Sequence, residues 1–554
     1  MHIIIVLIIL LAGTVAHAQH GHGSHGGAEK KPPIWLDGGL GSVDHPVTTK
    51  NAEAQKFFNQ GLAYLYAFNH AEGINSFRHA AELDPEMAMA YWGIALGLGS
   101  NYNVTADEAQ LTDAYANLRK AIELSARSSE ADRDFIAALS KRYAKDPKTD
   151  RQKLAADYKQ AMSELAKKYP DDLDAATLYA ESMMNLRPWQ LWSLDGKPAE
   201  GTLEIMAVLE GVMRRSPKHT GANHYYIHAV EASPNPEKGM GAAKRLEGLA
   251  PSAGHLVHMP SHIYLRTGDF ADAVKSNEDA IVADRDYIQK SGAAGVYPMM
   301  YYNHNIHMLA ASHAGNGNYA GAVKAARELE ANVGPNVKLM PMLEMFMPYT
   351  LVTLTRFHKW DEVTKYPQPA AELKITNAIW RAARGLAMSD TGKNLEAEKE
   401  LAGLREVLKT IPADAGFGNS SAHGVLKVAE ELLTGEIALA RGDKTGIDAL
   451  RRAAAAEDLV NYNEPPDWHL PTREWLGRAL LRQGNFAEAE TVYRQEIEKN
   501  PRNGRALFGL AEALRKQGKE SSAALVDREF REAWANSDTK LTVEDLYGPV
   551  RPRS

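Results

Sequence analysis

The segment KFFNQGLAYLYAFNHAEGINSFRHAAELDP (56–85) contains the clearest indication of the fold of this chain. Its apolar residues recur at three- and four-residue spacing in two runs, which predicts two amphipathic helices joined by a short turn. Gly61 lets the helices approach closely, with Tyr64 beneath it, and Phe77 packs from the second helix. Pro85 ends the unit because proline cannot continue a helix.

The same pattern continues along the chain. AMAYWGIALGLGSNYN (88–103) begins the next unit, and REWLGRALLRQGNFAEAETVYRQEIEKNP (473–501) is repeated in the same register by ALFGLAEALRKQGKESSAA (506–524). The period matches the length of one tetratricopeptide repeat (TPR) unit, about 34 residues. No alternating strand pattern of any length competes. We therefore predict an all-α fold, a TPR-type helical-repeat solenoid in which antiparallel helix pairs form a superhelix.

Composition narrows the function classes. The chain has 554 residues, 44% of them hydrophobic and 24% charged, as in soluble globular proteins. A net charge of −7 provides no basic stripe, so we predict no nucleic-acid partner. Because cysteine is absent, disulfides, thiolate metal sites and cysteine nucleophiles are excluded. The HExxH, GxSxG and GxxxxGK[ST] motifs are also absent.

The N-terminus predicts export. An apolar run from Ile3 to Leu11 precedes Ala16-His17-Ala18, which fits the small-x-small rule for signal-peptide cleavage, although the usual preceding positive charge is missing. The alternative is a membrane anchor, but the run is short for a bilayer. We expect cleavage after Ala18, a periplasmic or secreted protein, and no stable membrane insertion afterwards.

The chain is expected to divide into consecutive parts. After cleavage it would begin with a glycine-rich leader whose histidines could capture a metal ion, or which could be disordered with incidental histidines. The predicted parts are the signal peptide (1–18), the His/Gly-rich leader and linker (19–50), N-terminal repeats (51–200), histidine-rich central repeats (201–330), C-terminal repeats (331–535) and a tail (536–554).

Histidine packets in the central repeats are the main functional signal. The segments HYYIHAVE (224–231), GHLVHMPSH (254–262) and NHNIH (303–307) hold seven of the 20 histidines. Spacings of three and four residues place side chains on one helix face, and two pairs repeat at the period of one TPR unit. We expect these residues to meet on the concave face of the solenoid and to bind metal: His224, His228, His255, His258, His262, His304 and His307.

The residue types restrict the metal. Neutral imidazole suits copper, zinc, iron or nickel rather than calcium or magnesium. We favour copper or zinc, with iron as a further option, and the number of histidines also allows two ions. Eight of the 18 methionines lie between Met259 and Met347, and thioethers favour Cu(I), although methionine is more often core filler. Glu231, one turn beyond His228, is the candidate general base if the site is catalytic.

The chain resembles a group of exported bacterial TPR proteins of unsettled function. The resemblance lies in residues 60–103 and 224–270, and the most distinctive part is HLVHMPSHIY (255–264). The resemblance implies the fold and little chemistry. It leaves a metalloenzyme, redox or hydrolytic, and a metal-handling protein loaded through its leader both open. The competing hypothesis is a metal-free scaffold that binds a peptide or protein partner in its concave groove, and the sequence does not decide whether the protein is an enzyme.

Overall fold

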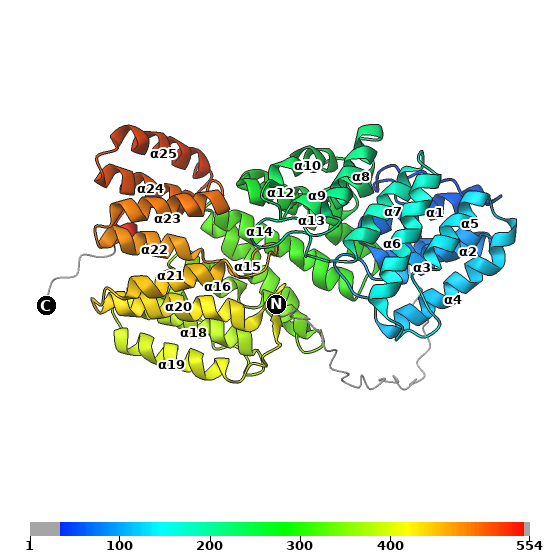
Figure 1. The fold of residues 1–554 in the computed structure, drawn as a ribbon. Coiled ribbons are helices and arrows are strands. Elements are labelled where there is room, and N and C mark those ends of the chain that lie inside the picture. Colours follow the sequence, from blue (N-terminus) through cyan, green and yellow to red (C-terminus); the bar gives the residue numbers. More distant parts are fainter. Residues whose placement is uncertain (1–33, 548–554) are drawn as a thin grey trace. The chain divides into compact units, whose positions relative to one another are not determined.

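The computed structural model describes residues 34–547 of the chain. Within that range the protein is built mainly of α-helices, joined by turns and a few longer irregular segments (Figure 1). The all-α helical-repeat prediction is therefore confirmed. The predicted signal peptide and the leader histidines His20, His22 and His25 lie outside the described residues, and the division of the repeats at residues 200 and 330 stays a prediction.

The first half of the described chain is a series of helices that follow one another closely (Figure 1). They are α1 (Ala52–Tyr66), α2 (His70–Leu83), α3 (Ala88–Leu98), α4 (Glu108–Leu124), η1 (Ser125–Arg127), α5 (Glu130–Leu139), α6 (Arg151–Lys168), α7 (Leu173–Met184), α8 (Thr202–Arg215), α9 (Thr220–Val230), η2 (Pro236–Gly239), α10 (Met240–Leu246), α11 (Gly254–His258), α12 (Pro260–Thr267) and α13 (Phe270–Ser291).

The second half starts with a π-helical turn in the segment that interrupts the repeat pattern. Its elements are η3 (Tyr297–Tyr302), α14 (Asn303–Gly315), α15 (Tyr319–Val333), η4 (Gly334–Asn336), η5 (Pro341–Phe346), α16 (Tyr349–Arg356), α17 (Trp360–Lys365), α18 (Lys374–Asp390), α19 (Asn394–Leu408), β1 (Gly416–Phe417), β2 (Ser420–Ser421), α20 (Ala422–Ala440), α21 (Gly446–Glu457), α22 (Thr472–Arg482), α23 (Phe486–Lys499), α24 (Gly504–Lys516), α25 (Glu520–Ala533) and α26 (Val543–Tyr547). The two strands pair antiparallel in a two-stranded sheet that the sequence did not predict.

An aromatic ring wedged between two glycines sets the spacing of the repeats. A Cβ atom on Gly61 would lie 2.6 Å from the Phe77 ring, and one on Gly93 would lie 2.5 Å from the same ring. Gly61 therefore packs on Phe77, whereas the Tyr64 hydroxyl turns away to donate to Asp37 at 3.4 Å. Helices this close leave no room for a side chain at either glycine.

The same arrangement recurs in the C-terminal repeats. Cβ atoms on Gly477 and Gly509 would lie 2.5 Å and 2.2 Å from the Tyr493 ring. In both cases the aromatic residue lies midway in the sequence between its two glycines, at the same spacing. The first and the last repeats of the described chain therefore share the same glycine–aromatic packing.

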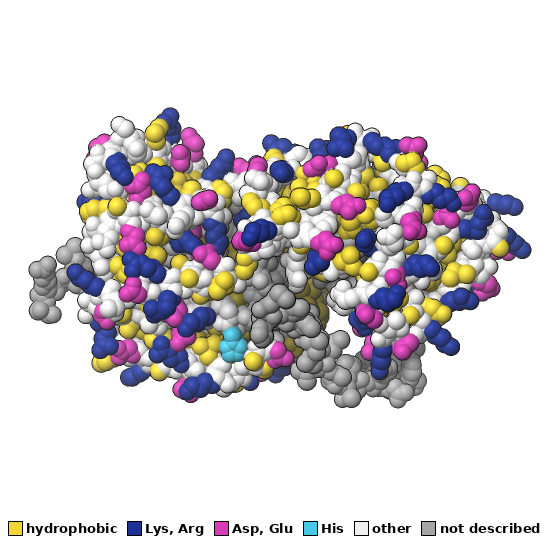
Figure 2. Space-filling model, in the orientation of Figure 1, with side chains coloured by type: hydrophobic (Ala, Val, Ile, Leu, Met, Phe, Trp, Pro, Cys, Tyr) yellow, Lys and Arg dark blue, Asp and Glu magenta, His cyan; other side chains and the backbone are white. Residues whose placement is uncertain are grey.

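Two large apolar cores follow one another along the chain. The first contains buried side chains between Ala54 and Tyr301, and the second contains buried side chains between Val352 and Leu546. Positive and negative side chains are interspersed on the face drawn in Figure 2. Among the described helices, none combines the length and the apolar character needed to span a membrane.

Candidate metal centre

Six of the seven predicted histidines lie together where α9, α11, α12 and α14 meet. They form two groups of three, in each of which one nitrogen per residue lies within 4.8 Å of the others. We call His224, His228 and His255 the first set, and His258, His262 and His304 the second set. All six side chains are buried except that of His304, which is half-buried.

Local helical structure explains the second set. The chain from α11 into α12 stays helical through Met259, so His258 and His262 project from the same face one turn apart. Pro260 is accommodated at the first position of α12, where its missing N–H costs little. His304, on α14, completes the set with its ring centroid 4.7 Å from that of His258.

Hydrogen bonds fix the proton positions in the second set. The amide of Asn277 donates to the Ala273 carbonyl at 2.8 Å, so its oxygen faces His258 Nδ1, also at 2.8 Å. His262 Nδ1 lies 2.6 Å from a Glu231 carboxylate oxygen. Because both oxygens are acceptors, each Nδ1 donates a hydrogen, which leaves an unprotonated Nε2 on each ring. Those two Nε2 atoms lie only 2.8 Å apart.

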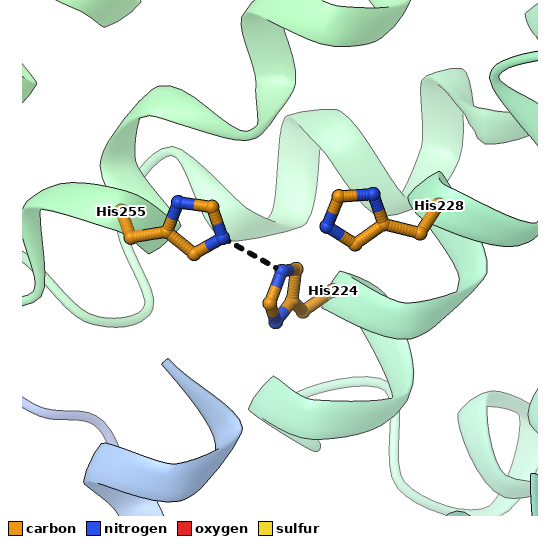
Figure 3. Close-up of side chains that lie close together, drawn as sticks. All are labelled: His224, His228 and His255. Atoms are coloured by element: carbon orange, nitrogen blue, oxygen red, sulfur yellow. Dashed lines mark hydrogen bonds between the residues drawn. The ribbon is translucent and has the colours of Figure 1, made fainter. Parts of the chain in front are cut away.

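The first set is arranged in the same way (Figure 3). His224 Nδ1 donates to the backbone carbonyl of Tyr66 at 2.7 Å, and His228 Nδ1 donates to Glu231 at 2.9 Å. His224 Nε2 lies 3.1 Å from His255 Nε2. The Nε2 atom of His228 has no hydrogen-bond partner.

The Glu231 carboxylate holds one histidine of each set. One oxygen accepts from His228 and the other from His262, which is the arrangement that orients metal-binding imidazoles from outside the ligand sphere. A role for Glu231 as general base stays a prediction, since both of its oxygens are engaged here. Glu231, His228 and His262 are also close enough to form a ligand group by themselves.

A second buried carboxylate, Glu464, lies against the same cluster. One of its oxygens is 3.1 Å from His262 Nδ1, but that hydrogen points to Glu231, so neither Glu464 oxygen accepts a hydrogen bond. Burial, together with the charge of Glu231, raises the pKa of Glu464 well above its usual range. Burial also raises the pKa of Glu231, against the opposing effect of His262.

Burial keeps the imidazoles neutral. Removal from water lowers the pKa of His228 and of His258 to about 3, and that of His262 to about 4. For His224, His255 and His304, burial and then neighbouring histidines lower the pKa well below 6.5. Neutral imidazole is the form that coordinates transition metals.

His307 lies outside both sets. Its ring packs against Tyr349 at a centroid distance of 4.3 Å and against His469 at 5.2 Å. It is buried, and neither of its ring nitrogens has a hydrogen-bond partner. The irregular segment 461–471 therefore brings two residues inward, His469 beside His307 and Glu464 beside His262.

The methionines between residues 259 and 347 mostly serve packing. Five of them pack against the apolar cluster around Leu343 and Phe346: Met299, Met300, Met340, Met345 and Met347. Met259 and Met308 are fully buried, and Met342 is 60% exposed. Core packing accounts for most of these positions, so the methionines add little to the choice between copper and zinc.

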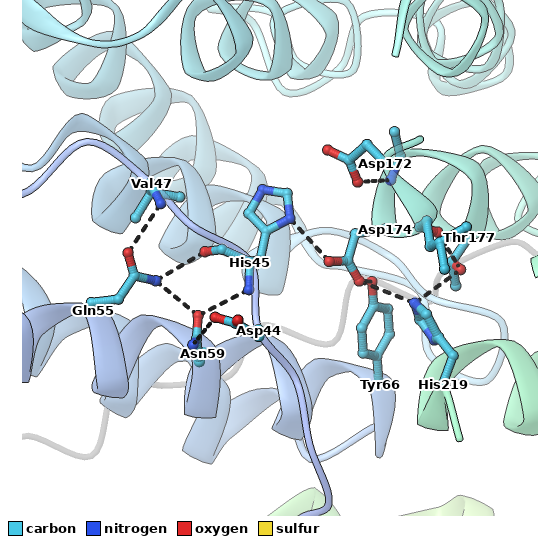
Figure 4. A network of polar contacts seen from close by, with 12 residues as sticks. Asp44, His45, Val47, Gln55, Asn59, Tyr66, Asp172, Asp174, Thr177 and His219 are labelled. Carbon is cyan, nitrogen blue, oxygen red and sulfur yellow. Dashed lines mark hydrogen bonds and ion pairs between the residues drawn. The ribbon is translucent and has the colours of Figure 1, made fainter. Parts of the chain in front are cut away.

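Sequence reasoning missed a second polar network, centred on Asp174 (Figure 4). The Asp174 carboxylate lies 3.0 Å from His45 Nδ1 and 3.2 Å from His219 Nε2, and it accepts from the Tyr66 hydroxyl at 2.5 Å. Burial would raise the pKa of Asp174, but the hydrogen bonds from His219 and His45 outweigh it and hold that pKa well below its usual range. Tyr66 connects this network to the first set, because its carbonyl accepts from His224.

Glu464, Asn277 and Asp174 gave little local signal in the sequence. Glu464 precedes two prolines in an irregular segment, Asn277 lies within a long amphipathic helix, and Asp174 lies in the first turn of α7. The role of each residue is visible only from the side chains that it contacts on other helices or segments.

Comparisons with known proteins support the repeat assignment at the C-terminus. Residues 476–538 match the tetratricopeptide repeat family, which confirms the repeats predicted there. The solved structures found to be similar include the human IFIT1 dimer with m7Gppp-AAAA, at 13% identity over 88% of this chain and 91% of that chain, with a TM-score of 0.32. The APC/C hetero-tetramer Cut9-Hcn1 matches at 12% identity over 89% and 75% of the two chains, with a TM-score of 0.30. No curated protein matches the sequence.

Proposed function

We propose that this helical-repeat protein binds a transition-metal ion through the second set. The observation that carries the proposal is the 2.8 Å separation of His258 Nε2 and His262 Nε2, two unprotonated nitrogens whose lone pairs face each other. Without a cation between them, this contact is repulsive. Ligand nitrogens on one tetrahedral ion lie about 3–4 Å apart, so a small opening of the pair would accommodate an ion.

The surroundings support an N-donor metal site. Asn277 and Glu231 hold the two rings through their Nδ1 hydrogens, and such outer contacts fix ring orientation and raise ligand basicity. The donor set suits copper, zinc or iron. Three imidazoles leave one position of a tetrahedral ion open for water or a substrate, as in catalytic zinc sites. A substrate that binds the ion at this open position would make the site catalytic, and a site that only holds the ion would serve metal storage or delivery.

Elemental analysis tests the proposal. The full chain is purified without chelator or an affinity histidine tag, beside the His258→Ala/His262→Ala double variant and a matched His307→Ala control. We expect at least one bound ion per chain in the unchanged protein and in the control, and one ion fewer in the double variant, with equal helix content by circular dichroism. Because the double variant could lose its fold, His304→Ala at the half-buried position serves as a second test. Full metal content in both variants, or none in any protein after incubation with Cu²⁺ or Zn²⁺, would overturn the proposal.

We also propose that the protein acts outside the cytoplasm, on the basis of the apolar run from Ile3 and the Ala16-His17-Ala18 cleavage signal. Fusing residues 1–30 to a reporter enzyme that is active only after export should give active reporter. N-terminal sequencing of the mature protein should begin at Gln19. A protein that keeps the segment from Met1 to Ala18 and stays in the cytoplasm would contradict this location.

The alternative function is a scaffold that binds a partner, and one surface feature favours it. Residues of α22, α23 and α24 line a hollow beside His358, together with Leu541, Asp545 and Leu546 of the C-terminal segment. Arg478 and Arg505 lie in its wall with Glu474 and Asp545. Arg478 pairs with Glu436 and Glu474 pairs with Arg356, so Arg505 is the cation that would attract an acidic peptide. Removal of residues 541–554 should then increase capture of an acidic peptide, and Arg505→Ala should reverse that increase. Unchanged capture in the shortened protein would argue against a peptide site in this hollow.

A further inference from the structure

The first set contains buried ring nitrogens that have no hydrogen-bond partner. His228 is 1% exposed and its Nε2 has no hydrogen-bond partner, although its Nδ1 is committed to Glu231. His255 is also 1% exposed, and its Nδ1 has no partner. Leaving a buried polar atom without a hydrogen-bond partner destabilises the fold. The unpaired His228 Nε2, beside the close contact of His224 Nε2 and His255 Nε2, therefore indicates a ligand.

A shared proton cannot satisfy this group. Since His224 Nδ1 donates to the Tyr66 carbonyl, His224 Nε2 is unprotonated. A hydrogen on His255 Nε2 could be donated to His224 Nε2 across the 3.1 Å gap. His228 Nε2 would still have no hydrogen-bond partner, and His255 Nδ1 would be unprotonated and unpaired. A metal ion bound to one nitrogen of each ring would accept the lone pairs of His224 Nε2 and His228 Nε2. It would also take the place of the direct contact between His224 Nε2 and His255 Nε2.

The walls of the first set are aromatic. Phe68 packs on all three rings, at centroid distances of 4.5 Å to His224, 5.7 Å to His228 and 5.5 Å to His255. Tyr301 packs on His255 at 4.9 Å. This packing locks the ring orientations and supplies few alternative hydrogen-bond partners. A site with rigid imidazoles and apolar walls is preorganised for an ion.

The two sets are neighbours. The centroid distance is 5.6 Å between His228 and His262, and it is also 5.6 Å between His255 and His258. Glu231 accepts a hydrogen from one member of each set. Ions bound to the two sets would therefore be close enough for one small ligand to contact both, as in two-metal sites.

We propose that the first set, His224, His228 and His255, binds a second transition-metal ion, and that the protein holds a two-ion centre oriented by Glu231. This inference rests on the proposed function, because it places the second ion beside the ion assigned to the second set. The ligand class is a metal that accepts three neutral imidazoles. The competing arrangement is a single ion held between the sets by His228, Glu231 and His262.

Metal counting on the full chain tests the inference. Metal-free protein is incubated with Zn²⁺ or Cu²⁺, freed of excess metal and analysed for bound ions, beside His224→Ala, His304→Ala and the His307→Ala control. We expect two ions in the unchanged protein and the control. One ion should remain in His224→Ala, and one in His304→Ala, because each variant removes a ligand from only one set.

Anomalous diffraction of the Zn²⁺-loaded protein decides the arrangement independently of any variant. Two peaks, one in each set, are expected. In the Cu²⁺-loaded protein, magnetic coupling between neighbouring ions should reduce the electron paramagnetic resonance signal below that of two isolated ions.

The failures of the two proposals are distinguishable. A single peak in the second set, with His224→Ala keeping all its metal, would overturn the second ion and leave the proposed function standing. A single peak beside Glu231 would overturn the two-ion arrangement. No metal in any preparation would overturn both proposals.

Discussion

Glu231 accepts the Nδ1 hydrogen of His262 at 2.6 Å, across a sequence separation of 31 residues. Both side chains are 1% exposed. Glu231 directly follows α9, and His262 lies in α12, so their contact joins two helices of consecutive repeats. Through its other oxygen, Glu231 also holds His228. One carboxylate thus orients a histidine in each set and makes the two sets a single structural unit.

Replacing Glu231 by glutamine should weaken metal binding about 10- to 100-fold, the usual effect of losing a partner that orients a metal ligand. Glutamine offers one oxygen, so its amide hydrogens would face the Nδ1 hydrogen of either His228 or His262. Competition with a coloured chelator measures the affinity. Glu237→Gln, at an exposed position six residues along the chain, is the matched control and should bind metal normally. Equal affinity in both variants would remove Glu231 from the site.

His307→Ala and His469→Ala should each keep the full metal content. Their rings pack on each other at a centroid distance of 5.2 Å and on Tyr349, outside both sets. Because His307 is buried, its truncation should lower the free energy of unfolding while the metal-to-protein ratio stays constant. Metal analysis and urea unfolding of the same samples separate the two effects. Loss of an ion from folded His307→Ala would place this residue among the ligands after all.

Gly61→Ala and Gly509→Ala should each destabilise the protein by about 1–3 kcal/mol, the range for overpacking a close-packed core. The added methyl groups would lie 2.6 Å from Phe77 and 2.2 Å from Tyr493, so the helices must move apart. Gly248→Ala is the control, since a Cβ atom there meets nothing within 4 Å. Urea unfolding followed by circular dichroism measures the change. Variants as stable as the control would refute this glycine–aromatic packing.

Asp284 should make stability depend on pH. Burial raises its pKa to about 7, although Tyr297 and Asn305 donate hydrogen bonds to it at 2.8 Å and 2.7 Å. The unfolded chain releases this proton near pH 3.9, so the folded state binds more protons between about pH 4 and pH 7. The stabilisation that the proton contributes is complete below that window and is lost as the pH rises through it.

Asp284→Asn should remove this dependence and make the metal-free protein more stable than the unchanged protein at pH 8, by at most about 4 kcal/mol. The exposed Asp286→Asn variant, two residues further along α13, serves as control and should follow the unchanged protein. Urea unfolding at pH 5 and pH 8 provides the comparison. A similar pH dependence in all three proteins would mean that Asp284 ionises normally in the fold.

Much of the fold could be predicted from the sequence because its signals are local. The helical spacing in residues 56–85, the repeat period and the glycines beside aromatic residues each act within one repeat or between neighbours. Repeat proteins are stabilised mainly by such nearest-neighbour contacts. The repeat period also predicted that histidines of the three packets lie near one another, because equivalent positions of stacked helices face the same region. The two-residue strands β1 and β2 had no comparable signal because they are short.

The helical repeats and the residue types gathered at their centre follow from local sequence patterns. Long-range contacts determine which histidines meet, that His307 packs against His469, and that Glu464 reaches His262 from a distant segment of the chain. These contacts depend on how the helices cross and on how an irregular segment folds back. Both are fixed by packing between distant parts of the chain, which no local pattern encodes.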